Sequence, residues 1–179
     1  MLAEMKREVF VSLEHSELGL FCLEPILAVY KKEAQRFQGT EHEFKSAFYK
    51  QMSPNQRALF MFYAYFNHAQ KSAGELYWWS AYYLAQPQAW TAIKKGMDIF
   101  GTEEMLSLAE NIEQVLRSRN APEQLGQFKS TFNDLEKDRE LRLAIEPLYT
   151  KLLHISHSEL KKIGCHIRAN RHDYIRLTD

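Results

Sequence analysis

Histidine is the side chain with the widest chemical range in this sequence, which contains seven of them. His154 and His157 are three residues apart, so one helix face could carry both, with Glu159 nearby. Zinc and iron sites need three or four well-placed ligands. Ser156 lies between the pair and resembles a helix N-cap, which would separate the two imidazoles. We therefore predict no metal site and no cofactor.

The sequence also lacks the known motifs that place catalytic or metal-binding residues at fixed intervals. A di-iron bundle needs Glu-x-x-His pairs, and none of the histidines has Glu three residues before it. H-E-x-x-H, G-x-S-x-G and Gly-rich phosphate loops do not occur. Cys165 precedes His166, but neighbouring residues on a helix point about 100° apart, so this pair is no catalytic dyad. Cys22 and Cys165 are predicted to be free thiols without a disulfide, as in a reducing cytosol.

Aromatic side chains form the densest group that could bind a ligand, and residues 77–84 read YWWSAYYL. Trp and Tyr are enriched in binding surfaces, although aromatic residues also fill protein cores. Trp78 and Trp79 cannot both face inward unless their helix is buried on two sides, so at least one is expected at a cleft or interface. The candidate binding residues are Tyr65, His68, Glu75, Trp78, Trp79 and Tyr82.

Two predicted helices, about 54–70 and 75–86, position these candidates. The SPNQ motif at 53–56 combines an N-cap Ser, Pro at the first helical position and Gln at the third. Residues 59–66 are all apolar or aromatic, which predicts a helix buried on every side. Gly74 favours a break between the two helices, because Gly inside a helix costs about 1 kcal/mol relative to Ala.

Charge also identifies this region as the centre of the fold. Residues 51–102 hold six charged side chains and residues 103–146 hold sixteen. The first region cannot cover itself with solvated groups, so we expect the rest of the chain to pack around it.

Start and stop signals divide the remaining chain. Thr40, Thr102 and Ser156 are predicted N-caps, and Pro25 is predicted to begin a helix. Pro147 is expected to bend or split the helix that contains it. The remaining predicted helices are 25–38, 40–52, 88–100, 103–116, 123–135, 138–154 and 156–170.

These elements predict an all-α fold, a single compact helical domain of about 7–9 helices around a buried, aromatic-rich central helix, over residues 1–179. The first twenty residues stay undecided, since 8–13 reads equally as a short strand or a helix end. Residues 120–122 predict a loop, and 171–179 a short tail.

Composition limits the environment and the partners. No stretch approaches the ~20 apolar residues that a membrane span needs. The first residues are charged and lack the apolar core of a signal peptide, so a cytoplasmic protein is expected. The net charge is zero, which gives no electrostatic basis for binding nucleic acid or an acidic membrane.

Three segments resemble a bacterial family of small all-helical proteins that is best known through a DNA-mimic protein. They are MSPNQRALFMFYAYFNHA, AIKKGMDIFGTEEMLSLAENIEQVL and LYTKLLHISHSELKKIGCHIRANRHDYIRL, within residues 52–177. The resemblance implies an all-α fold and binding to another protein. The family's Asn-Gly-Gly-Phe turn is replaced here by residues 71–75, KSAGE. DNA mimicry needs many carboxylates, and only residues 103–146 are acidic, with ten acids and six bases.

Two functions remain open at this stage, beside the less favoured hypothesis of a metal protein that uses His154 and His157. The first is a non-catalytic protein-interaction or regulatory module that binds a protein partner or itself through the aromatic surface. The second is a small-molecule-binding protein or enzyme whose pocket is walled by Tyr65, His68, Trp78 and Tyr82.

Overall fold

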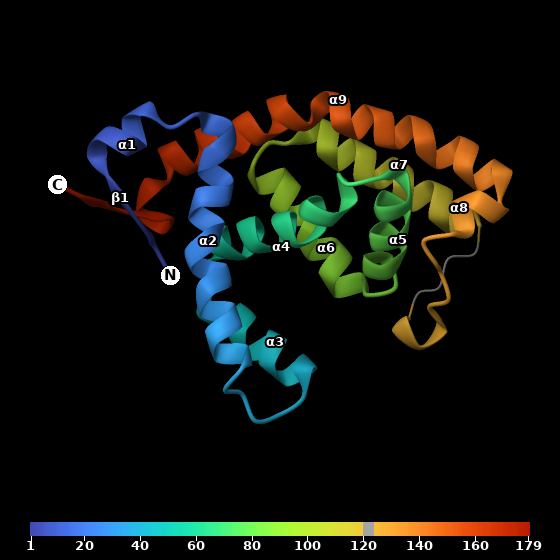
Figure 1. Ribbon diagram of the computed structural model, residues 1–179, viewed down its shortest axis with the longest axis horizontal. Helices are drawn as coiled ribbons and strands as arrows, with labels where there is room; N and C mark the ends of the chain where they lie inside the picture. Colours follow the sequence, from blue (N-terminus) through green and yellow to red (C-terminus); the bar gives the residue numbers. More distant parts are fainter. Residues whose placement is uncertain (120–123) are drawn as a thin grey trace.

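Helices make up most of the chain in the computed structural model, which describes residues 1–119 and 124–179 (Figure 1). In these ranges nine α-helices accompany two 3-10 turns and two short strands, and the predicted all-α compact helical domain is confirmed. The elements are β1 (Ala3–Lys6), α1 (Arg7–Ser12), α2 (His15–Ala34), α3 (Glu41–Gln51), α4 (Pro54–Ala69), α5 (Ala73–Leu84), α6 (Pro87–Ile99), α7 (Glu103–Ser118), η1 (Leu125–Gln127), α8 (Asp134–Lys137), α9 (Arg139–Ala169), η2 (Arg171–Asp173) and β2 (Ile175–Thr178). The loop predicted at 120–122 lies outside the described residues.

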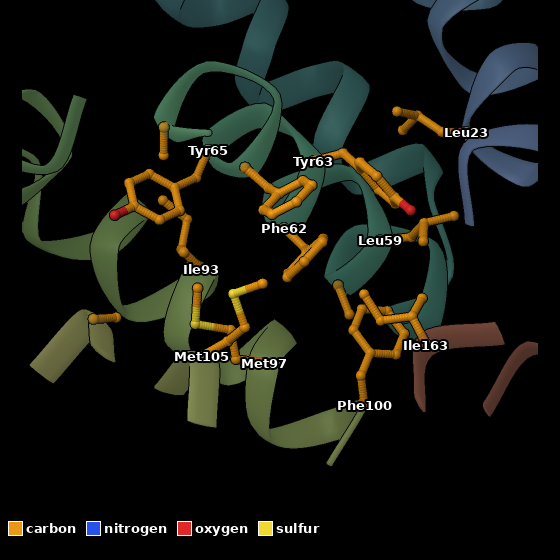
Figure 2. Close-up of a cluster of buried hydrophobic side chains, with 14 of the residues drawn as sticks. Leu23, Leu59, Phe62, Tyr63, Tyr65, Ile93, Met97, Phe100, Met105 and Ile163 are labelled. Carbon is orange, nitrogen blue, oxygen red and sulfur yellow. The ribbon is translucent and has the colours of Figure 1, made fainter. Parts of the chain in front are cut away.

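α4 is the central, aromatic-rich helix that the sequence predicts. The Ser53 side chain accepts a hydrogen bond from the Gln56 backbone N–H, and the Gln56 side chain accepts one from the Ser53 N–H. Between Leu59 and Phe66 every side chain is buried or half-buried. Figure 2 shows Phe62 and Tyr63 pointing into a cluster that other helices complete. Other helices therefore surround α4, as expected for a helix whose whole circumference is apolar.

Close helix crossings complete the core. A Cβ on Gly96 of α6 would lie 2.9 Å from the Ala58 carbonyl oxygen of α4, so these two backbones touch. A Cβ on Gly164 of α9 would lie only 1.9 Å from the His15 carbonyl oxygen at the start of α2. α9 runs along one side of the molecule and meets α2 at this crossing (Figure 1). Both crossings depend on the absence of a side chain.

α9 corrects the prediction of two helices separated near Ser156, and Pro147 does not split it. It is one continuous helix of 31 residues with Pro147 inside it. The Ser156 hydroxyl donates to the Leu152 carbonyl oxygen at 2.6 Å and caps nothing. Buried apolar side chains recur along the whole helix, from Leu141 to Ile167, and their packing outweighs the local break signals.

Two further helix predictions are wrong. α2 begins at His15 rather than at Pro25, which lies within it, because residues on both sides of the proline pack into the core. The helix predicted at 123–135 is absent from the described part of that stretch, which contains a 3-10 turn, an irregular segment and the start of α8. That segment instead lies against α5, as described below.

The two ends of the chain form the strand pair that the sequence did not predict. β1 and β2 run parallel, with Ala3 opposite Ile175. The buried Gln56 amide donates to the carbonyl oxygens of Met1, at 2.8 Å, and Asp173, at 3.0 Å. The undecided first twenty residues therefore form β1, α1 and the start of α2. The predicted tail forms η2 and β2, and its Asp173 carbonyl bonds it to Gln56 of α4.

No helix in the described ranges is long and apolar enough to cross a membrane. Cys22 is buried, Cys165 is exposed, and neither forms a disulfide.

Candidate functional site

The first turn of α5 sets which of its side chains face outward. Ser72 is the N-cap, and its hydroxyl oxygen accepts the Glu75 backbone N–H at 3.1 Å. Leu76, Ser80 and Leu84 then face inward and are buried. Four aromatic residues of α5 are only half-buried, and together we call them the α5 outer face: Trp78, Trp79, Tyr82 and Tyr83.

Trp78 is the centre of this face. Its indole stacks on Tyr82, with ring centroids 5.2 Å apart and an interplanar angle of 8°. On Phe132 it stacks at 4.8 Å and 20°, and Phe128 meets it edge-on at 5.4 Å. The indole Nε1–H donates to the Ser130 carbonyl oxygen at 3.0 Å. Trp78 is thus held by rings and by a main-chain acceptor from one short segment, residues 128–132.

Trp79 forms a second group beside it. Its ring stacks on His68 of α4 at 4.0 Å and 24°. The indole Nε1–H donates to the Glu75 carboxylate at 2.7 Å. Partial burial and the Lys71 cation lower the pKa of His68, against the opposing effect of Glu75, so its imidazole is neutral at physiological pH. His68 therefore contributes a flat, uncharged surface.

Tyr65 lies in the core on the inner side of α5, where its ring meets Tyr83 edge-on at 6.2 Å. It is 4% exposed, and its hydroxyl is 2.8 Å from Ser80 Oγ. Because the Ser80 hydroxyl donates to the Leu76 carbonyl oxygen at 2.6 Å, Tyr65 is the donor to Ser80. Burial raises its pKa far above the usual tyrosine range. The structure thus brings together His68, Glu75, Trp78, Trp79 and Tyr82, and places Tyr65 in the core.

Sequence reasoning missed the residues that cover Trp78. Phe128 and Phe132 are four residues apart, a spacing that favoured the helix predicted there. Polar residues between two apolar residues four apart are also what an amphipathic helix carries, so residues 129–131 gave no local signal of the irregular segment.

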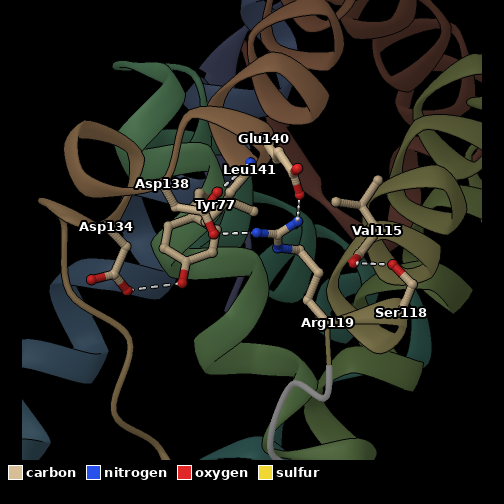
Figure 3. Close-up of polar contacts among 8 residues, drawn as sticks. All are labelled: Tyr77, Val115, Ser118, Arg119, Asp134, Asp138, Glu140 and Leu141. Atoms are coloured by element: carbon tan, nitrogen blue, oxygen red, sulfur yellow. Dashed lines mark hydrogen bonds and ion pairs between the residues drawn. The ribbon is translucent and has the colours of Figure 1, made fainter.

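A carboxylate fixes the end of this segment to α5. Asp134 accepts hydrogen bonds from Tyr77 Oη at 2.9 Å, from the Thr131 N–H at 2.9 Å and from Thr131 Oγ1 at 2.5 Å. Although partial burial raises its pKa, the hydrogen bonds from Thr131 and Tyr77 hold the pKa of Asp134 below its ordinary value. Figure 3 shows this contact beside Arg119, which pairs with Asp138 and, at 3.8 Å, with Glu140.

Groups suited to catalysis are dispersed. Within the described ranges no three His, Cys, Asp or Glu side chains are placed to hold a metal ion. His154 and His157 are exposed on α9, while His166 is half-buried between the rings of Phe100 and Tyr174. The exposed Cys165 is not joined to His166 by any hydrogen bond in the described structure.

A groove of ≈ 250 Å³ lies between the end of α2 and α3. Phe44 and Phe48 form its buried floor, and Phe37, 41% exposed, stands at its edge. Glu33 accepts a hydrogen bond from Gln51 at 3.2 Å across the rim, where Arg36 also lies. This groove is separate from the α5 outer face.

Comparisons with family models, with curated proteins and with solved structures find no match for this chain.

Proposed function

We propose that this chain is a bacterial, cytosolic protein-interaction module, regulatory in role and without catalytic activity, whose binding surface is the α5 outer face. The bacterial and cytosolic parts rest on the sequence resemblance and the free thiols. The observation that carries the proposal is Trp78, a half-buried indole that is stacked between rings and bonded to the main chain of an irregular segment.

The chemistry of this face suits a protein partner. Trp and Tyr supply large, rigid contact areas and dominate the energetics of protein interfaces. Trp79 extends the face through His68 and Glu75, so it combines flat rings with one carboxylate. The zero net charge of the chain disfavours nucleic acid as the partner.

Site-specific photo-crosslinking tests this proposal. Tyr82 is replaced by a photoreactive phenylalanine in the full chain, which is then irradiated in a bacterial extract. We expect a discrete adduct with one protein, because Tyr82 lies within the face and reaches solvent. The matched control carries the same group at Leu143, which is 58% exposed on α9. Identical adducts from both positions, or none from Tyr82, would count against the proposal.

The protein bound by the α5 outer face could instead be a second copy of this chain. Sedimentation of the purified chain over a range of concentrations separates the two cases, since a dimer made by the α5 outer face is weakened by Tyr82→Ala and not by Leu143→Ala.

Small-molecule binding is a second candidate, and the groove between α2 and α3 favours it. Its ≈ 250 Å³ is slightly below the ~300–1,000 Å³ typical of ligand pockets, and an apolar floor with Arg36 at the rim suits a small aromatic carboxylate. Thermal shift with 3-phenylpropionate tests this idea. A shift that Ala47→Phe abolishes supports it, because Ala47 lines the groove; no shift at millimolar ligand rejects it.

A further inference from the structure

The segment 128–132 contacts the α5 outer face as a bound peptide would. Residues 128–131 form no helix or strand, yet two side chains and one carbonyl of 128–132 meet the same indole. Phe128 packs edge-on against both Trp78 and Tyr82, at 5.4 and 5.7 Å. Phe132 stacks on the Trp78 ring, and Ser130 between them accepts the indole N–H. Side chains give the fit and the main chain gives a hydrogen bond, as in recognition of an extended peptide.

The backbone of this segment also packs against the first turn of α5. A Cβ built on Gly74 would lie 3.4 Å from the Phe132 carbonyl oxygen, which is an ordinary van der Waals distance. Residue 132 therefore contacts α5 through its main chain as well as through its ring.

The segment 128–132 is only partly buried against the α5 outer face. Phe132 remains 48% exposed although it stacks on Trp78. Apart from the rings and the Ser130 carbonyl, the segment is anchored by Asp134, which bonds Thr131 and Tyr77. A partner that supplied equivalent rings and a carbonyl could replace it without disturbing the buried side of α5.

We propose that the α5 outer face recognises an extended protein segment with two aromatic residues four positions apart and a free carbonyl between them. In the isolated chain residues 128–132 (FKSTF) occupy this site and compete with the partner. This inference rests on the proposed function and adds to it the class of ligand and an autoinhibitory contact.

The test uses a peptide of residues 126–133 (GQFKSTFN) and the full chain carrying Phe128→Ala and Phe132→Ala together. Binding is followed by the Trp78 indole N–H resonance, one of three tryptophan signals in the chain, assigned with Trp78→Phe. A tethered segment competes at an effective concentration of about millimolar. We therefore expect the peptide to bind the double variant at least ~10-fold more tightly than the wild-type chain. A peptide with both phenylalanines replaced by alanine should not bind.

A second variant keeps the test decisive if the double variant is poorly folded. Asp134→Asn retains both phenylalanines and removes the charge that anchors the segment, so it should also bind the peptide more tightly than wild type. Glu136→Gln, at an exposed position of the same short helix, is the matched control and should behave as wild type. Circular dichroism checks the fold of every variant.

Equal peptide affinity of wild type, the double variant and Asp134→Asn would overturn the inference. Concentration-dependent dimerisation of the double variant would also overturn it, because the occupant would then be a second copy. If photo-crosslinking at Tyr82 captures a protein equally from wild type and the double variant, the proposed function stands and the autoinhibitory contact fails.

Discussion

Glu113 should carry a large, pH-dependent part of the stability of the α6–α7 pair. On α7 its carboxylate accepts hydrogen bonds from Trp90 Nε1 and Lys94 Nζ of α6, both at 2.7 Å, and from Arg117 Nε at 2.9 Å. The side chain is only 17% exposed. Despite the opposing effect of burial, the bonds from Lys94, Trp90 and Arg117 lower the pKa of Glu113 from 4.5 to about 2.

This pKa shift sets the size of the stabilisation that the Glu113 carboxylate contributes. A displacement from 4.5 to about 2 corresponds to about 3 kcal/mol at 1.36 kcal/mol per pKa unit. Solvent near Lys94 and Arg117 screens part of this, so we expect about 2 kcal/mol. The folded pKa is depressed, so the stabilisation is complete above pH 4.5 and is lost as the pH falls towards 2.

Urea unfolding of Glu113→Gln and of wild type at pH 7, 5 and 3 measures the contribution of Glu113 to the free energy of unfolding. We expect the variant to lose about 2 kcal/mol at pH 7, and the difference to shrink markedly at pH 3. Glu110→Gln, at an exposed position of the same helix, is the control and should change stability by less than ~0.5 kcal/mol. A deficit that is the same at pH 7 and pH 3 would refute the electrostatic reasoning.

Three further predictions concern packing and buried polar groups. Gly164→Ala should destabilise the fold by ~3 kcal/mol or more in urea unfolding, because its Cβ would overlap the His15 carbonyl oxygen, whereas Gly126→Ala, with open space around it, should have little effect. Tyr63→Phe should leave the thermal midpoint unchanged or raise it, since the 1% exposed Tyr63 hydroxyl has no hydrogen-bond partner within the described residues; a marked fall would reveal a partner. Glu159→Leu should cost ~1–3 kcal/mol in calorimetry, because it removes the acceptor of the Met105 N–H in the first turn of α7; an unchanged protein would show that this bond is dispensable.

The capping-box pattern, Ser or Thr followed three residues later by Glu, shows where local reasoning succeeds and where it fails. Thr40 with Glu43 forms the predicted capping box, with both reciprocal bonds present. Ser156 with Glu159 has the same pattern, but the Ser156 hydroxyl bonds within α9. Glu159 accepts the backbone N–H of Met105 at 3.3 Å and lies 2.8 Å from Lys162 Nζ. It thus serves the first turn of α7, where the Thr102 hydroxyl donates to the Met97 carbonyl oxygen and does not cap the helix as predicted.

The candidate site was predictable in part. The adjacent tryptophans require two environments on one helix, and the structure provides them, with Trp78 against the segment 128–132 and Trp79 against His68. The covering segment was not predictable, because residues 52 positions apart meet in the bond from Trp78 to Ser130. Tyr65, a candidate from the sequence, points into the core, and this direction depends on the packing of α4 against α5.

The sequence by itself determined the all-α class, the central helix α4 with its Ser53 cap, the break before α5 and the end of the helix predicted at 88–100, after which Gly101 has a positive φ of 65°. These features depend on hydrogen bonds and backbone preferences that act within about four residues. Only the tertiary structure decided the continuity of α9, the pairing of β1 with β2 and the cover over Trp78. Those depend on which apolar surfaces meet, and burial between distant segments can outweigh a local break signal at a proline or serine.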